Sequence, residues 1–136
     1  YVDTATKLAQ NLYISASSIA QYAALAVFED KSKAIFEQRR MAFRERRDYL
    51  LEALQALGFI VPKSIQGAFY IYADISDFSN DSELFCKELL ENQQVAITPG
   101  TDFGDYRSKS FVRIAFTTSM EDLRLGIERI RSYLAR

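Results

Sequence analysis

Apolar residues recur at helical spacing in two stretches of the chain. In residues 33–57, large apolar side chains fall seven, seven, four and three positions apart, at Phe36, Phe43, Leu50, Leu54 and Leu57. This stretch ends at Gly58, a residue type that readily adopts the left-handed conformation found at helix ends. Near the end of the chain the spacing is four, three and four, at Leu123, Ile127, Ile130 and Leu134. Both patterns predict amphipathic helices that bury one face.

The first 30 residues follow a different pattern. Residues 2–12 predict one helix, and Ser18 and Gln21 form an S-x-x-Q capping box ahead of a second helix at 19–28. The second helix is almost entirely alanine and large apolar residues, and a helix that is apolar all round is buried on several sides. We therefore expect residues 1–30 to be a helical segment that packs on a missing domain or a partner subunit. Residues 31–136 would then form a separate C-terminal domain, which corresponds to the small domain of the family that the chain resembles below.

Shorter runs of β-branched and aromatic residues predict strands between the helices. These runs lie at 59–61, 68–73, 95–97 and 110–117. Asn80 and Glu83 have the spacing to cap a helix that reaches residue 92, and Thr118 and Glu121 have the spacing to cap the closing helix. The order of elements predicts an α+β fold, in which a small mixed or antiparallel sheet is covered by helices and preceded by the long helix.

Composition narrows the classes of function. A formal net charge of −1 gives no reason to expect nucleic acid or an anionic membrane as a partner. With no histidine and one cysteine, Cys86, the sequence excludes Ser-His-Asp and Cys-His nucleophiles, internal disulfides and cysteine-based zinc sites. No apolar run approaches the roughly 18 residues of a membrane span, and the amino end has no signal-peptide pattern. A single thiol fits the reducing cytoplasm, where we expect the protein, but it fits other compartments almost as well.

A charged residue stands in the middle of the clearest predicted strand. In the run FVRIAF at 111–116, Val112, Ile114 and Phe116 share one face, which we assign to the core, so Arg113 points the other way. Arg113 must reach water, pair with an acid or bind a ligand, because burial without a partner would be strongly unfavourable. Arginine also binds carboxylates through two parallel hydrogen bonds. The strand alone is therefore compatible with a surface arginine and with a carboxylate site.

Two further segments are candidates for such a site. Gly67 precedes a strand, a place where glycine allows close approach of backbone or ligand. Phe69 and Tyr70 on that strand are residues of a kind found more often in a core than in a pocket. The turn-rich loop 99–104, PGTDFG, leads toward the strand arginine but lacks the Gly-Lys-Ser/Thr ending of a P-loop. Arg107 and Lys109 are expected to be solvated, so a dicarboxylic ligand would need a second cation from elsewhere.

Taken in order, six segments resemble the C-terminal part of the class I/II aminotransferases, the fold-type-I enzymes that use pyridoxal 5′-phosphate. The segments are SSIAQYAALAVFED at 17–30, RRDYLLEAL at 46–54, GAFYIY at 67–72, VAITPGTDFG at 95–104, FVRIAF at 111–116 and TTSMEDLRLGIERI at 117–130. Together they cover nearly the whole chain.

The resemblance implies a site. In the family, the arginine of the FVRIAF-like strand binds the substrate α-carboxylate, and here that residue is Arg113. The GAFY-like segment, here Gly67 and Phe69, is expected to line the substrate pocket, and the loop 99–104 to lie near its mouth. The family's Schiff-base lysine, phosphate-binding residues and pyridine-nitrogen acid lie upstream of this segment. This chain is therefore expected to contribute no catalytic or cofactor-binding residue and to be inactive alone.

The resemblance also implies partners, and it leaves alternative functions open. The substrates would be an amino acid and a 2-oxo acid, the cofactor pyridoxal 5′-phosphate, and the assembly a homodimer. Relatives of this architecture also catalyse β-elimination, decarboxylation or acyl-CoA condensation, and the residues that discriminate these reactions lie upstream. A further alternative is a non-catalytic module of a regulator that uses Arg113 to sense a carboxylate, which an upstream helix-turn-helix would favour.

Overall fold

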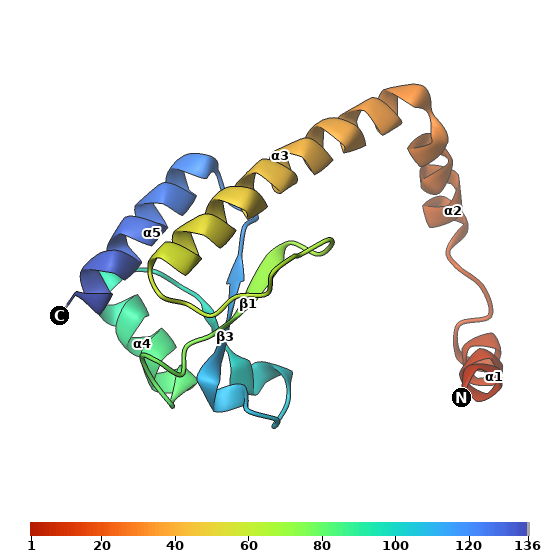
Figure 1. Cartoon of the computed structure of the whole chain (residues 1–136). Coiled ribbons are helices and arrows are strands. Elements are labelled where there is room, and N and C mark those ends of the chain that lie inside the picture. The colour runs from red at the N-terminus through yellow and green to blue at the C-terminus, as the bar shows by residue number, and fades with distance from the viewer. Residues whose placement is uncertain (136) are drawn as a thin grey trace. The chain divides into compact units, whose positions relative to one another are not determined.

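The computed structural model describes residues 1–135 (Figure 1) and confirms the expected α+β class. The helices are α1 (Val2–Leu12), α2 (Ser18–Leu25), α3 (Asp30–Ala56), α4 (Ser82–Gln93) and α5 (Met120–Leu134). The strands are β1 (Tyr70–Asp74), β2 (Thr98–Pro99) and β3 (Phe111–Ala115), and the 3-10 helices are η1 (Ala26–Phe28), η2 (Gly100–Phe103) and η3 (Ser108–Ser110). Within residues 1–135, no helix combines the length and the apolar content needed to cross a membrane.

The chain divides into two compact units, Tyr1–Arg40 and Met41–Arg136. The domain boundary that we predict from the sequence lies earlier, at the start of α3. In the first unit no residue is buried, and its large apolar side chains, among them Ile19, Tyr22 and Phe28, are exposed. The packing of this unit on a large domain or a partner subunit stays a prediction.

The predicted capping box at Ser18 is wrong. Helix α2 begins one residue earlier than expected, with Ser17 as its N-cap and no side-chain cap hydrogen bond. This shift places Gln21 one position too far into the helix to return to the capping residue, and its Nε2 atom donates to the Ala16 carbonyl oxygen at 2.8 Å instead.

The second unit contains a three-stranded antiparallel sheet in the order β1-β3-β2. Arg113 of the middle strand β3 lies opposite Tyr72 of β1 and Thr98 of β2, while Ile71 lies opposite Ile114. Because directly opposed residues share a face, one face of the sheet carries Ile71 and Ile114 and the other carries Tyr72, Thr98 and Arg113.

Two of the predicted strands are wrong. Residues 59–61 contribute only an isolated bridge, in which Ile60 and Asp74 exchange both backbone hydrogen bonds. The next pairing position would be Pro62, which has no N–H to donate. The strand expected at 95–97 is absent because Gln94 adopts the left-handed conformation that ends α4, and the Val95 amide donates back to the Leu89 carbonyl.

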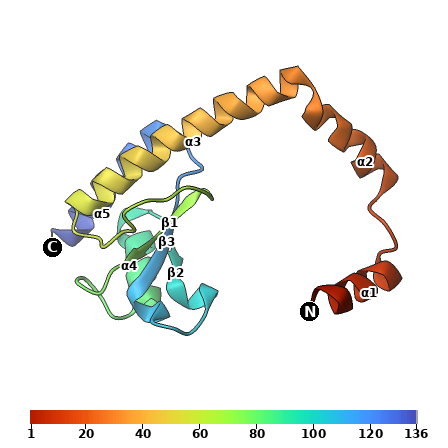
Figure 2. The same ribbon diagram turned by 45° about the vertical axis from the view of Figure 1, so that its right-hand side comes forward.

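The core lies on the face of the sheet that carries Ile71 and Ile114. The second half of α3, together with α4 and α5, covers this face, and Figures 1 and 2 both show α5 beside that half of α3. The fully or nearly fully buried residues of the core are Leu50, Leu54, Phe59, Ile71, Ala73, Ile75, Phe85, Cys86, Leu89, Val112, Ile114, Phe116, Leu123, Ile127 and Ile130. Five of these residues, Leu50, Leu54, Leu123, Ile127 and Ile130, belong to the helical stripes predicted from the sequence, and Gly58 has the expected positive φ, +93°.

The two remaining caps lie one residue later than predicted. Asp81, rather than Asn80, caps α4, and its side chain accepts a hydrogen bond from the Leu84 amide. Ser119, rather than Thr118, caps α5, and its hydroxyl accepts from the Asp122 amide. In both cases a neighbouring residue of the same chemistry could serve as the cap, so the spacing alone could not distinguish them.

Candidate functional site

Arg113 lies at the centre of the sheet face that points away from the core. Its strand neighbours Val112 and Ile114 are buried on the other face, as the alternation predicts, while Arg113 itself is half-buried. As a residue of the middle strand it has a neighbour on each side, Tyr72 and Thr98. Arg113 therefore projects from the middle of the sheet rather than from an edge.

The guanidinium of Arg113 has few polar partners. Its Nη2 atom donates to the Thr98 hydroxyl at 3.3 Å, and within residues 1–135 the structure gives it no carboxylate partner. Its Nε atom is buried without a hydrogen-bond acceptor among the described residues. Two aromatic rings face it, with the guanidinium carbon 4.7 Å from the ring centre of Phe103 and 5.5 Å from that of Tyr70. A ligand that brought anionic acceptors here would form charge-assisted hydrogen bonds.

A cavity of about 480 Å³ opens beside Arg113. Its lining residues come from β1, β3 and the segment that runs from the end of η2 to the start of η3: Tyr70, Tyr72, Phe103, Gly104, Asp105, Tyr106, Ser108 and Arg113. Half of these lining residues are aromatic, namely Tyr70, Tyr72, Phe103 and Tyr106. Asp105 is the acidic residue of the lining, and it is exposed.

The loop at the start of η2 is shaped by a glycine. Gly100 is buried, and a Cβ atom at this position would lie 2.7 Å from the Phe111 carbonyl oxygen, 2.8 Å from the Tyr72 hydroxyl and still closer to the Ser108 carbonyl oxygen. These distances are too short for any side chain, so the backbone can follow this path only if residue 100 is glycine. This passage leads η2 back over the sheet and brings Phe103 to the guanidinium of Arg113.

A second arginine near the site is already paired. Arg107 Nη2 lies 3.1 Å from Asp74 Oδ2 across the end of β1, and its guanidinium carbon lies 5.5 Å from the ring centre of Phe111. The Phe111 ring stacks on Tyr72 at 4.9 Å, and burial raises the pKa of Tyr72 above its ordinary value. The prediction that Arg107 is simply solvated is therefore incomplete: its side chain is 55% exposed but bound to Asp74.

The two pocket residues suggested by the sequence lie outside the lining of this cavity. Phe69 is 51% exposed and packs edge-to-face on Tyr70, and the position of Gly67 is open, since a Cβ atom there would have no neighbour within 4 Å. Their role in a pocket stays a prediction. The resemblance places the loop 99–104, which contains Phe103, near the pocket mouth but does not single out Phe103 itself. The sequence favours a core position for Tyr70, although its two-residue offset from Tyr72 puts both side chains on the face of Arg113. Thr98 is missed altogether, and it carries no comparable signal.

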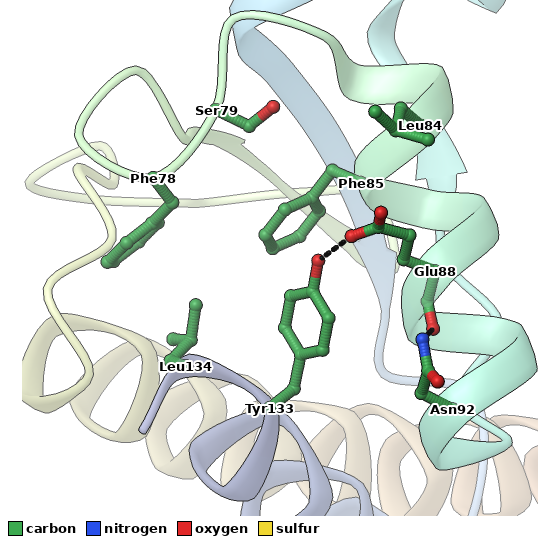
Figure 3. Close-up of a pocket in the computed structure, with 8 residues that line it drawn as sticks. All are labelled: Phe78, Ser79, Leu84, Phe85, Glu88, Asn92, Tyr133 and Leu134. Carbon is green, nitrogen blue, oxygen red and sulfur yellow. Dashed lines mark hydrogen bonds between the residues drawn. The ribbon is translucent and has the colours of Figure 1, made fainter. Parts of the chain in front are cut away.

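Another cavity, of about 530 Å³, lies between α4, α5 and the loop before α4 (Figure 3). Its polar groups are paired within the chain: Tyr133 donates to Glu88 Oε2 at 2.6 Å, and the Asn92 side-chain amide donates to the Glu88 carbonyl. Its remaining lining is largely apolar and includes Phe78 and Phe85. Because no cation lines it and its polar groups pair with one another, the Arg113 cavity is the better candidate for a functional site.

Comparison with known proteins identifies the class to which this fold and site belong. The sequence profile described as "Aminotransferase class I and II" matches residues 1–130, so the chain belongs to the class I and II aminotransferase family. It is 38% identical over 127 residues to a valine–pyruvate aminotransferase of Mycobacterium tuberculosis, and 40% identical over 124 residues to an aspartate/prephenate aminotransferase of Thermus thermophilus.

The matches cover nearly all of this chain but a smaller share of its relatives. The two enzymes match over 93% and 90% of this chain, which correspond to 33% and 31% of their own lengths. The crystal structure of an aminotransferase from Mycobacterium tuberculosis superimposes with a TM-score of 0.88 at 37% identity, covering 94% of this chain and 33% of that chain. The chain thus spans about a third of the length of these relatives.

Proposed function

We propose that this chain is the C-terminal small domain of a pyridoxal 5′-phosphate-dependent aminotransferase, in which Arg113 binds the α-carboxylate of the substrate. The parent enzyme would move an amino group between an amino acid and a 2-oxo acid. The observation that carries the proposal is the state of Arg113: half-buried beside a cavity, with one neutral hydrogen-bond acceptor and no carboxylate partner among the described residues. Family membership and relatives named as aminotransferases support it.

The role of Arg113 in this proposal is to position the substrate. Amino acids and 2-oxo acids share the α-carboxylate, so one arginine serves both partners of the reaction. A guanidinium that grips this carboxylate through two hydrogen bonds fixes the orientation of Cα, and orientation of this kind lowers the barrier without the arginine taking part in bond making.

The residues of the cavity do not fit covalent attachment of the cofactor. Pyridoxal 5′-phosphate supplies the electron sink for amino-group transfer when it is bound, and its attachment requires a lysine. No lysine lines the cavity beside Arg113. The proposal therefore places the lysine and the other cofactor-binding groups in a large domain outside this chain, and it expects the chain alone to be inactive.

The assembly and location follow from the same proposal. The exposed apolar side chains of residues 1–40 would be covered by the large domain or by a second subunit of a homodimer. We place the enzyme in the cytoplasm, where the single buried thiol of Cys86 would stay reduced.

The test is Arg113→Ala in the full-length protein that carries this chain. Loss of the guanidinium should lower kcat/KM for amino-acid and 2-oxo-acid turnover by about a hundredfold to a thousandfold, the range expected when a buried charge loses its partner. Uptake of pyridoxal 5′-phosphate, followed by its absorbance, should be unchanged. Arg124→Ala is the matched control, because Arg124 is exposed on α5 and contacts the Tyr49 ring away from the cavity. Unchanged turnover in Arg113→Ala with cofactor bound would refute the assignment.

A further inference from the structure

We propose that Phe103 and Tyr70 are positioning residues whose two rings form an aromatic clamp on the Arg113 guanidinium and set its affinity for carboxylates. This inference rests on the proposed role of Arg113 and extends it to the groups that hold the guanidinium in place. The two rings come from separate elements, Phe103 from η2 and Tyr70 from β1. The guanidinium carbon lies 4.7 Å from the first ring centre and 5.5 Å from the second, both within the range of cation–π attraction.

The need for a clamp follows from the scarcity of other restraints. Arginine has a long side chain with many rotamers, and ordering it for a ligand is entropically unfavourable. In the described structure the only hydrogen-bond acceptor that restrains the guanidinium is the Thr98 hydroxyl, at a long 3.3 Å, and no carboxylate of residues 1–135 pairs with it. The two rings are therefore the principal contacts that fix the guanidinium.

Aromatic rings suit this role better than acidic side chains. A carboxylate from the protein would occupy the same N–H donors that the substrate must use, and it would compete with the ligand for the positive charge. A ring attracts the cation through its face and takes up no N–H donor. The clamp can therefore restrain the guanidinium while its outward donors remain free for a carboxylate.

Phe103 is itself held in place by a neighbouring aromatic ring. Its ring meets Tyr72 edge-on at 6.1 Å, and Tyr72 stacks on Phe111, whose ring also contacts Arg107. Arg107 in turn is tied to Asp74 at 3.1 Å. This row of packed groups gives the half-exposed Phe103 a fixed position. Phe103 is a large aromatic residue on an exposed loop, and the proposed contact with Arg113 gives it a role in addition to packing.

The clamp predicts a distinct kinetic pattern in the full-length holoenzyme. Phe103→Leu keeps an apolar side chain but removes the ring, so KM should rise roughly tenfold, within the range of a partly desolvated cation–π contact. The rise should be similar for the amino acid and for the 2-oxo acid, since both present the same α-carboxylate, while kcat changes by less than about threefold. Phe103→Tyr restores a ring and should return KM to near the wild-type value.

Controls separate this effect from a change in folding. Phe78→Leu is a matched control, because Phe78 is also partly exposed on a loop but lines the other cavity and packs against Phe59. It should leave both KM values unchanged. Circular dichroism and cofactor absorbance report whether each variant is folded and loaded. Should Phe103→Leu fail to fold, Tyr70→Leu removes the second ring and carries the same test.

Arg113→Ala, assayed alongside, distinguishes failure of the clamp from failure of the proposed function. If Arg113→Ala turns over normally, the carboxylate site itself is wrong. If Arg113→Ala is strongly impaired but Phe103→Leu and Tyr70→Leu behave as wild type, the clamp is refuted and the carboxylate site stands. A defect that Phe103→Tyr shares fully with Phe103→Leu would also refute the clamp, because the effect would then not come from the ring.

Discussion

The two faces of the sheet are built from the same strands but have different surroundings. On the core face, Ile71, Val112 and Ile114 are covered by three helices and are nearly inaccessible to solvent. On the opposite face, Tyr72 and Arg113 alternate with them along the same backbone and line an open cavity. Because strand side chains alternate, five residues of β3 can serve the stability of the fold and a ligand site at once.

This difference shows how the two roles can be separated by substitution. Apolar burial on the core face stabilises the folded state in proportion to the area removed from water. The cavity face instead contains a cation with few partners, which contributes little to stability and which, in the proposed function, a ligand would pair. Truncation of side chains on the core face should therefore lower the free energy of unfolding, whereas truncation of side chains that line the cavity should mainly alter ligand affinity. A change to the backbone path that supports the cavity should instead affect stability.

Gly100→Ala should have the largest effect, and it tests how the cavity face is built. The added methyl group would overlap two backbone carbonyl oxygens and the Tyr72 hydroxyl, so the chain between β2 and η3 could not keep its path. We expect a loss of roughly 5 kcal/mol in the free energy of unfolding, measured by urea denaturation. Gly126→Ala is the control: nothing lies within 4 Å of its Cβ position in α5, and alanine should stabilise that helix by up to about 1 kcal/mol. Equal stabilities for the two variants would contradict the close approach at Gly100.

The thiol of Cys86 tests whether the core face is closed to solvent. Cys86 is 7% exposed, and burial, with a smaller contribution from the charge of Asp102, raises the pKa of its thiol from 9.0 to about 12. At pH 8 the folded protein should therefore react with a thiol reagent about a thousandfold more slowly than the urea-unfolded chain. Since the folded state holds this proton more tightly, stability should also decrease as the pH rises from about 9 to about 12. Rapid labelling of folded protein at pH 8 would show that the core face is open.

Ile71→Ala and Ile60→Ala compare the same substitution at a covered and an open position. Ile71 is fully buried in β1, whereas Ile60 is exposed at the bridge to Asp74. Loss of the buried side chain should lower the free energy of unfolding by about 3 kcal/mol, while the exposed one should contribute less than about 1 kcal/mol. In the full-length enzyme, Ile71→Ala should leave the KM values close to wild type at temperatures where the protein stays folded. A large rise in KM would mean that the two faces are not independent.

Regular periodicity made one part of this structure predictable. The spacing of apolar residues locates α3 and α5, and strand alternation assigns Val112 to the core and Arg113 to the other face, because both periods are fixed by backbone geometry. The surroundings of Arg113 have no such periodic signal. Thr98 becomes its neighbour through a strand of two residues, and Phe103 reaches it through a 3-10 turn that depends on the contacts of Gly100. These contacts join residues distant in sequence, and tertiary packing alone brings them together.

The smallest predicted effect concerns the cap of α5, where sequence spacing and structure differ by one residue. Ser119 accepts from the Asp122 amide and donates to the Asp122 carboxylate, whereas Thr118 only donates to that carboxylate. Ser119→Ala should therefore lower the free energy of unfolding by about 1 kcal/mol, and Thr118→Ala by less.

The dependence of this cap on pH supplies a further check. Hydrogen bonds from Ser119 and then Thr118 lower the pKa of Asp122 below 3.8. The stabilisation that this carboxylate contributes is thus present above pH 3.8 and is lost as the pH falls through the lowered pKa. Urea denaturation at about pH 7 and at a series of lower pH values should show the deficit of Ser119→Ala shrinking as the carboxyl becomes protonated, because the protonated carboxyl no longer gains from the hydroxyl donors. If Thr118→Ala lowered the free energy of unfolding more than Ser119→Ala at neutral pH, the cap would be Thr118, as the sequence spacing predicts.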